Sequence, residues 1–466
     1  MKDLADLGKP RIVPPLHQHF RPAVLANHAY LKAVRGSGRE VPLAIGLERH
    51  EGHFSVYRTR CFEEGSDLAP LNLPYAERLV KMLLWQRGGW RIVVGGPRSV
   101  GEHIRQVYSG TGARAFDVDF MAGVYEHPFA VEITDAGQIP PASEGTIALG
   151  GHLEGCRLGF DLGATDRKVA AVLDGRAVFT EEVVWDPRNA PDPQYHFDQI
   201  MSALRSGAAH LPRVDAIGGS AAGVYINSRP RAASLYRAVP KELFDTKIDS
   251  LYRDLKHGWG DIPFEVVNDG EVTALAGAMS LQDNAVLGIA LGSSQAGGYV
   301  TESGEITTWL NELAFCPVDY YPDAPVDEWS GDAGCGAQYF SQQAVFRLAI
   351  EAGIELDSSL GAAEKLKSVQ EGLRSGDERA HRIFETIGCY AGYGVAHYAD
   401  FYTLRHVLIL GRVTSGEGGS IILKRAQEVL RAEFPGLAET IGLHLPDESS
   451  RRVGQAVAAA SLPALK

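Results

Sequence analysis

Residues 157–174 read RLGFDLGATDRKVAAVLD, and this stretch decides the fold. Its first apolar run ends at a single carboxylate, Asp161, and a turn of small residues, 163–165, leads into a second apolar run from Val169. The pattern predicts a β-hairpin with an acid at the end of its first strand. Small turn residues let backbone N–H groups approach an anion, and a nearby carboxylate can hold a metal ion through water. The hairpin therefore suits a magnesium nucleotide, although similar strings also occur in ordinary hairpins.

Length and composition limit the classes of protein. A chain of 466 residues is long enough for two or three domains, and 45% hydrophobic with 22% charged residues is typical of a globular protein. A formal net charge of -13 argues against a nucleic-acid or anionic-membrane surface spread over the whole protein and leaves room for a local basic site. The five cysteines are scattered without a CxxC pair, so we expect reduced thiols and a cytoplasmic protein. With neither an apolar leader nor a run of about 18 apolar residues, we expect no secretion and no membrane span.

The first third of the chain predicts an α/β domain of its own. A strand pair is expected from Val41, and residues 90–104, WRIVVGGPRSVGEHI, predict a strand and a glycine turn into a helix. The strand pair resembles a degenerate copy of the 157–174 hairpin, in which His50 occupies the position of the turn glycine Gly163. We assign this region no chemistry and favour a packing or oligomerisation module. Residues 138–151, QIPPASEGTIALGG, are the expected linker.

The segments after the hairpin alternate between strands and helices. A third strand is predicted at 177–184 and a helix at 195–208, followed by VDAIGGSAAGVY, a short strand ending in small residues around Gly223. These small residues would let a substrate approach the backbone. A polar, irregular region is expected over 227–259. The strand PFEVV at 263–267 then ends in Asn268 and Asp269, at a helix N-terminus where open α/β sheets hold ligands.

A second glycine hairpin is predicted in the next segment, residues 285–306, AVLGIALGSSQAGGYVTESGEI. It repeats the pattern of the first hairpin, with a phosphate-sized Gly/Ser turn between two strands. Two similar halves that face each other across a cleft would produce such a pair of hairpins.

These residues resemble the ROK family of sugar kinases and related repressors, within the actin/hexokinase superfamily. Four motifs carry the resemblance over about 157–466: GFDLGAT (159–165), VVNDGEVTALAG (266–277), IALGSSQAGG (289–298) and HVLILGRVTSGEGGSII (406–422). The resemblance implies an α/β fold of two actin-like (ribonuclease H-like) lobes around a cleft, with an extra N-terminal α/β domain. The expected domains are 1–150, 151–285 with the C-terminal helix 452–466, and 286–451.

The resemblance also implies roles for individual residues. Asp269 matches the catalytic base, which chemistry supports because phosphoryl transfer to a hydroxyl needs a carboxylate within hydrogen-bond reach of it. Asp161 would hold Mg²⁺ through water. The expected substrate ligands are Asn268, Glu312 and Gly223. The expected ATP-binding residues are Asp161, Gly163, Thr165, Gly292, Ser293, Ser294, Gly411 and Gly416.

The chain departs from the family pattern at the sugar and zinc positions. Phe315 stands where the family has a histidine, and Ala337 where it has a second sugar-binding glutamate. The segment EWSGDAGCGA keeps Cys335 but lacks two other cysteines, so no zinc site is expected, because one thiolate cannot close a tetrahedral site. Glucose is therefore a doubtful substrate. The aromatic residues Trp309, Phe315, Tyr320, Tyr321 and Trp329 fit either a stacking floor for a sugar or a core.

The leading hypothesis is an ATP-dependent kinase of a sugar or sugar-like polyol, a cytoplasmic homodimer with ATP and Mg²⁺ as cofactors and neither nucleic acid nor membrane as partner. The alternative is a catalytically inactive sugar- or nucleotide-binding regulator on the same fold, motivated by Phe315 and Ala337. An acyl-phosphate kinase or ATPase is a third possibility, and a DNA-binding repressor is disfavoured because residues 1–150 show neither a convincing helix-turn-helix nor a basic surface. Three of these residues also have a purely structural interpretation: Asp269 as a helix N-cap, Asp161 as a turn acid and Glu312 as a loop glutamate.

Overall fold

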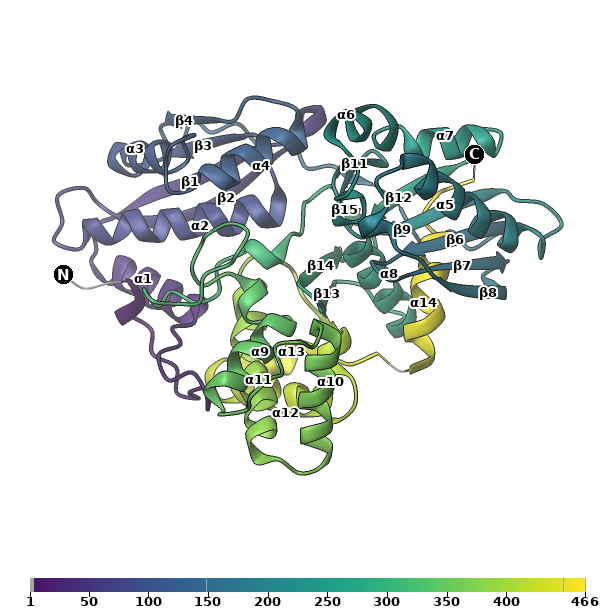
Figure 1. Cartoon of the computed structure of the whole chain (residues 1–466). Helices are drawn as coiled ribbons and strands as arrows, with labels where there is room; N and C mark the ends of the chain where they lie inside the picture. Colours follow the sequence, from purple (N-terminus) through teal and green to yellow (C-terminus); the bar gives the residue numbers. More distant parts are fainter. Residues whose placement is uncertain (1–3, 148, 447, 466) are drawn as a thin grey trace. The chain divides into compact units, whose positions relative to one another are not determined.

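The computed structural model describes residues 4–147, 149–446 and 448–465 (Figure 1). It forms two compact units. Unit 1 comprises Met1–Gly145, Ile289–Ala296 and Thr308–Leu445, and unit 2 comprises Thr146–Gly288, Gly297–Thr307 and Pro446–Lys466. The three-domain division stays a prediction.

Unit 2 contains a five-stranded sheet in the order β12-β9-β6-β7-β8. Its strands are β6 (Cys156–Leu162), β7 (Asp166–Leu173), β8 (Arg176–Val184), β9 (Ala216–Ala221) and β12 (Phe264–Asn268). The hairpin predicted at 157–174 is confirmed, because β6 and β7 pair antiparallel with Phe160 opposite Val169. Strand β9 runs parallel to both β6 and β12, so the carboxyl ends of these three strands share one edge of the sheet.

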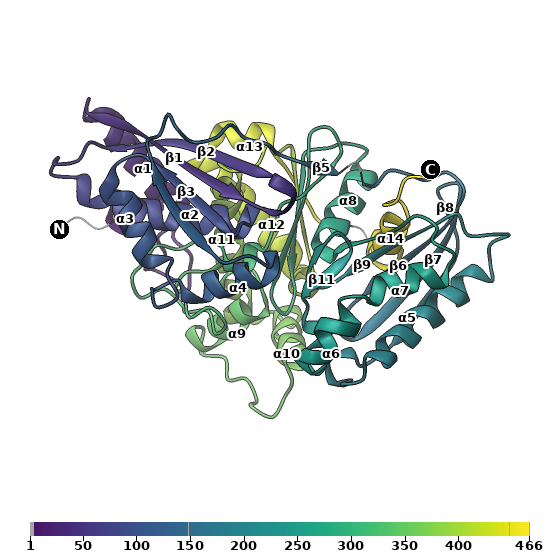
Figure 2. The ribbon, with the colours of Figure 1, turned by 90° about the horizontal axis from the view of Figure 1, so that it is seen from above.

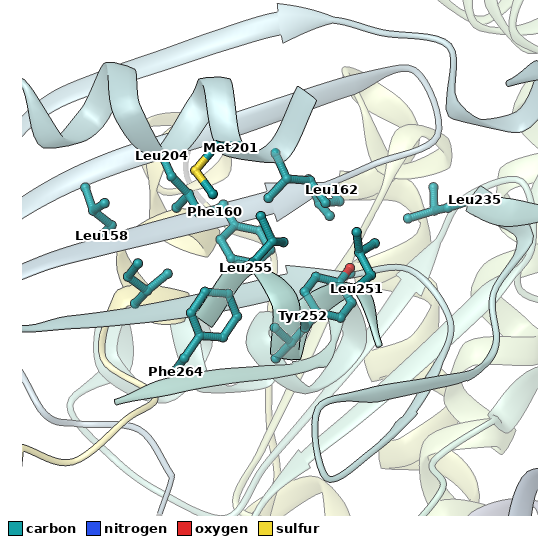
Figure 3. Close-up of a cluster of buried hydrophobic side chains, with 14 of the residues drawn as sticks. Leu158, Phe160, Leu162, Met201, Leu204, Leu235, Leu251, Tyr252, Leu255 and Phe264 are labelled. Carbon is teal, nitrogen blue, oxygen red and sulfur yellow. The ribbon is translucent and has the colours of Figure 1, made fainter. Parts of the chain in front are cut away.

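The sheet of unit 2 is covered on both faces, which explains why β6 is a buried apolar run. Figure 3 shows one face, where Leu158, Phe160 and Leu162 pack against side chains of α5 (Pro193–Ala208) and α7 (Leu251–Gly258). On the other face lies α14 (Glu448–Ala460; Figure 2), and Cβ atoms at Gly159 and Gly218 would collide with its backbone. Each buried Leu or Phe stabilises the fold by about 1.5–3 kcal/mol.

The region 227–259 corrects an expectation, because it is not irregular. It holds β11 (Arg229–Ala232), a π-helical turn at Phe244–Ile248 and α7. Its apolar residues Leu251, Tyr252 and Leu255 recur at helical spacing and are buried in the core. Charged residues on the opposite face make α7 amphipathic, but the helix has only 8 residues, so the periodic pattern is short.

A six-stranded sheet in the order β17-β16-β13-β14-β15-β5 contains the second glycine hairpin, β13 (Val286–Leu291) and β14 (Gln295–Val300). The division between the units passes through these two strands. The other strands are β16 (His406–Leu410), β17 (Gly442–His444), β15 (Ile306–Thr307) and β5 (Thr146–Ile147). Strand β5 lies inside the expected linker, which is therefore partly ordered by pairing with β15.

The remaining helices of the C-terminal part form a layer in unit 1. They are α9 (Gln342–Glu351), α10 (Ala362–Arg374), α11 (Glu378–Ala399), α12 (Glu417–Glu433) and α13 (Pro435–Thr440). Glycines on α11 allow α12 to pack closely, since a Cβ at Gly392 would meet Val429. In the described part of the chain, no helix is both long and apolar enough to cross a membrane.

The N-terminal part of unit 1 is an α/β domain, as predicted. Its sheet has the order β2-β1-β3-β4, formed by β1 (Glu40–Glu48), β2 (Phe54–Phe62), β3 (Arg91–Gly95) and β4 (Ala130–Thr134). Its helices are α1 (Ala23–Gly36), α2 (Asn72–Arg87), α3 (Arg98–Val107) and α4 (Ala115–Tyr125). The likeness to unit 2 ends at the hairpin, because β3 is antiparallel to β1 whereas β9 is parallel to β6.

Candidate functional site

The parallel strands of unit 2 bring the predicted acids to one edge of the sheet. In the register of β6, β9 and β12, Asp161 lies opposite Ser220, and Ser220 lies opposite Val267. Asp269 follows β12 directly and is the first residue of α8 (Asp269–Leu281). Because these parallel strands end at the same edge of the sheet, both carboxylates lie at the carboxyl edge, where open α/β sheets hold ligands.

Asn268 fixes the start of α8. Its side-chain oxygen accepts a hydrogen bond from the Gly270 N–H at 2.7 Å, so Asn268, not Asp269, is the N-cap. Its amide nitrogen donates to the Gly223 carbonyl at 2.6 Å and ties the cap to the segment after β9. Gly223 has φ 132° and its Cβ would collide with the backbone of β11, so only glycine fits there.

Asp161 is 5% exposed and has two neighbours that respond to its charge. The Ser220 hydroxyl donates to its carboxylate at 2.7 Å, and the Lys168 Nζ lies 3.5 Å from the other oxygen and 3.0 Å from Asp166. Burial raises the pKa of Asp161, and the Lys168 cation and the Ser220 hydrogen bond oppose that rise. Lys168 is thus part of the acidic edge of the sheet.

Asp269 is a partly buried acid with a pKa suited to proton transfer. Burial raises its pKa to about 6, and the negative charge of Asp161 adds to the shift. The Gly270 N–H, 3.0 Å from its carboxylate, acts in the opposite direction. A carboxylate with a pKa near 6 is largely ionised at pH 7 and still basic enough to accept a proton from a hydroxyl.

The first glycine turn is closed by its own hydrogen bonds. The Gly163 N–H donates to the Asp166 carbonyl at 2.9 Å, and the Gly163 carbonyl accepts from the Trp185 indole at 2.8 Å. Thr165 is exposed, and its hydroxyl donates to the Asp166 carboxylate at 3.0 Å. Gly163 therefore shapes the turn, and Thr165 is the predicted phosphate contact at its exposed end.

The second glycine turn lies in unit 1 between β13 and β14. The Gly292 N–H donates to the Ser294 carbonyl at 3.0 Å, and Ser293 and Ser294 are exposed. In the same unit Gly411 has φ 103°, and its Cβ would collide with the Leu291 backbone, so β16 turns beside the end of β13. Gly416, with φ 66°, is the N-cap of α12. These glycines permit the turns at which the ATP contacts were predicted.

Glu312 follows a residue in a strained conformation. Asn311 is 2% exposed and has φ 52°, in the left-handed region that non-glycine residues seldom adopt. The Asn311 and Glu312 N–H groups donate to carbonyls of α2. Phe315, which stands in place of the family histidine, stacks on Trp85 with ring centroids 4.2 Å apart.

The structure also gives the burial of the remaining residues at the expected sugar and zinc positions and of the aromatic residues. Ala337 and Cys335 are buried, as is Tyr320. Trp329 is 69% exposed, so the five aromatic residues do not form one floor. Within the described ranges, no group of three or more His, Cys, Asp or Glu residues could hold a metal ion.

Sequence reasoning missed Ser220 and the links between α2 and the segment around Glu312. Ser220 lies in a strand of small residues, and nothing local distinguishes it from a packing serine. The register of β6 and β9 alone reveals it.

Comparison with known proteins identifies the fold through solved structures. No known family model matches the chain, and no curated protein matches it in sequence. Among solved structures it is similar to a ROK family glucokinase from Streptomyces griseus, determined with glucose and AMPPNP (21% identity, TM-score 0.50), over 66% of this chain and 98% of that one. The chain has the fold of the ROK proteins.

Two further structures have the ROK fold. A ROK hexokinase from Thermus thermophilus has 18% identity and a TM-score of 0.50, covering 65% of this chain and 97% of that one. A ROK transcriptional regulator, a homolog of the E. coli MLC protein, has 18% identity and a TM-score of 0.54, covering 66% and 78%. The predicted fold class, an actin-like ROK architecture with an additional region, is thereby confirmed.

Proposed function

We propose that this protein transfers a phosphoryl group from ATP to a hydroxyl of a sugar or sugar-like polyol. The observation that carries the proposal is Asp269, a carboxylate with a pKa of about 6 at the carboxyl edge of the parallel strands, the same edge that holds Asp161. A general base works best when its pKa lies near the working pH. The ROK fold of the glucokinase and hexokinase neighbours supports the same reaction class.

The residues of unit 2 fit a magnesium nucleotide. Asp161 offers hard oxygen ligands, the type that Mg²⁺ prefers, and Mg²⁺ usually keeps several waters and phosphate oxygens as its other ligands. In bound form, Mg-ATP supplies the phosphoryl group and neutralises its charge. Asp269 would accept the proton of the acceptor hydroxyl, while Asn268 would orient that acid through its cap of α8 and contact the acceptor. Gly223 would allow the acceptor to approach the backbone.

In unit 1 we propose that Gly292, Ser293 and Ser294 contact the phosphates, Gly411 and Gly416 the adenosine, and Glu312 the acceptor. We also propose a cytoplasmic homodimer. The five cysteines, all buried and free in the structure, support a reducing compartment.

The test is a panel of monosaccharides and polyols assayed by ADP release with Mg-ATP. Asp269→Asn should lower kcat by about 10²–10⁴-fold on the best acceptor, the usual contribution of a general base. Asp245→Asn is the matched control, because Asp245 is an exposed acid of the same unit that pairs with Lys241. Full activity of Asp269→Asn would show that another group takes the proton.

A second function is a sugar-binding regulator without turnover. It is favoured by Phe315, whose ring is engaged with Trp85, and by the buried Ala337, both at positions where sugar ligands were expected. The ROK regulator among the structural neighbours is in keeping with it. Calorimetry that found sugar binding, together with ADP release at the uncatalysed rate, would support this function over the kinase.

A further inference from the structure

We propose that the N-terminal domain is a positioning scaffold for Glu312, with helix α2 holding the segment 311–335 and Lys81 as the positioning residue that anchors its far end. This inference rests on the proposed function in one respect, that Glu312 contacts the acceptor. All the residues in the argument belong to unit 1.

The first support is the C-terminus of α2. The last carbonyls of a helix lack partners inside the helix and need other donors. Here the Gln86 carbonyl accepts from the Asn311 N–H at 2.8 Å, and the Trp85 carbonyl accepts from the Glu312 N–H at 3.0 Å. The helix end therefore fixes the backbone of Glu312 directly.

The second support is the strained Asn311. A buried non-glycine residue with positive φ is strained and persists only where its surroundings hold it. The bond to the Gln86 carbonyl and a 2.8 Å bond from the Tyr402 hydroxyl to the Asn311 side chain hold it here. Without α2 this conformation would lose one of these two bonds.

The third support is an ion network at the far end of the segment. Asp332 forms ion pairs with Lys81 of α2 and with Arg114, and Lys81 also lies 3.2 Å from Asp117. Lys81 and Asp117 are fully buried. Burial alone would lower the pKa of Lys81, but the Asp117 and Asp332 carboxylates outweigh it and the pKa is raised. Loss of Lys81 would remove the ion pair of the buried Asp117 and leave Asp332 with Arg114, so the end of the segment depends in part on Lys81.

Further contacts also bind the segment to the N-terminal domain. Phe315 stacks on Trp85, and the Arg78 guanidinium donates to the Ala333 carbonyl at 3.1 Å. Helix α1 contributes as well, since the Ala23 N–H donates to the Val318 carbonyl at 3.0 Å. The domain thus contacts the segment at its start, middle and end.

Hydrogen exchange and kinetics together test the inference. In Lys81→Met, amide exchange in a peptide covering 309–320 should accelerate by at least about tenfold, because local opening becomes easier. The KM for the acceptor should rise by about tenfold or more, with the KM for ATP changing less than about twofold, because only the acceptor contact is displaced. Ile104→Ala is the control: it removes fully buried atoms from α3 of the same domain and should leave exchange in 309–320 unchanged.

Asp332→Asn is the second variant, because it keeps an acceptor for Lys81 and decides the matter if Lys81→Met does not fold. Wild-type exchange rates in the folded variants, or equal acceleration by Ile104→Ala, would overturn the inference. If the wild-type protein phosphorylated no acceptor, the proposed function would fail while the exchange measurement still decided the scaffold.

Discussion

Asp269→Asn should stabilise the folded protein while removing its activity. The pKa of Asp269 is about 6 against an ordinary value of 3.8, so the folded state disfavours its ionised form. Two pKa units correspond to about 3 kcal/mol, at about 1.4 kcal/mol per unit. Loss of a carboxylate from the first turn of α8 costs about 0.5 kcal/mol through the helix dipole. The expected net gain is therefore about 2.5 kcal/mol at pH 8.

The pH dependence gives the sign. A raised carboxyl pKa means that the folded state binds more protons than the unfolded state between pH 3.8 and about 6. The penalty of the wild-type protein is complete above pH 6 and disappears as the pH falls through this window. The advantage of Asp269→Asn should shrink accordingly when free energies of unfolding are measured in urea at pH 8, 6 and 4.5. An advantage that is absent at pH 8, or equal at all three values, would refute the reasoning.

Three further predictions concern the same edge and its support. The kcat/KM of the wild-type protein should rise with pH through an apparent pKa of about 6. Asp161→Asn removes a like charge and should therefore move this rise to lower pH, which the pH profile of the residual activity would show. Gly270→Ala should destabilise the protein by more than about 2 kcal/mol in thermal unfolding, because the new Cβ would collide with the Gly297 carbonyl. The control is Gly123→Ala on α4, where the new Cβ would lie in open space, and it should be neutral or stabilising by up to about 1 kcal/mol. EDTA should abolish ADP release and added Mg²⁺ should restore it, whereas restoration by Zn²⁺ alone would contradict the assigned ligand chemistry.

Much of unit 2 could be predicted from local sequence because its signals are local. The hairpin around Asp161 combines two apolar runs with a turn, and Asn268 and Asp269 follow an apolar strand directly. Short-range patterns of this kind specify strand, turn and helix start without knowledge of tertiary contacts. The fold class followed once these motifs were found in a fixed order.

The rest depends on contacts between distant residues. Ser220 meets Asp161 only through strand register, and Lys81 meets Asp332 across 251 positions of the chain. Buried charges read as surface charges in a sequence, since Lys and Asp are mostly exposed in proteins. The sequence therefore predicted the α/β fold of the N-terminal domain, but it did not predict the contacts of this domain with the segment around Glu312.

The central claim is that Asp269 at the sheet edge takes the proton of an acceptor hydroxyl. The most direct test is ³¹P NMR of wild-type protein with Mg-ATP and each sugar or polyol of the panel, with Asp269→Asn in parallel. The account predicts a phosphate-ester signal with at least one acceptor, and only background with Asp269→Asn that remains folded and still binds ATP. An ester formed equally by both proteins would contradict it.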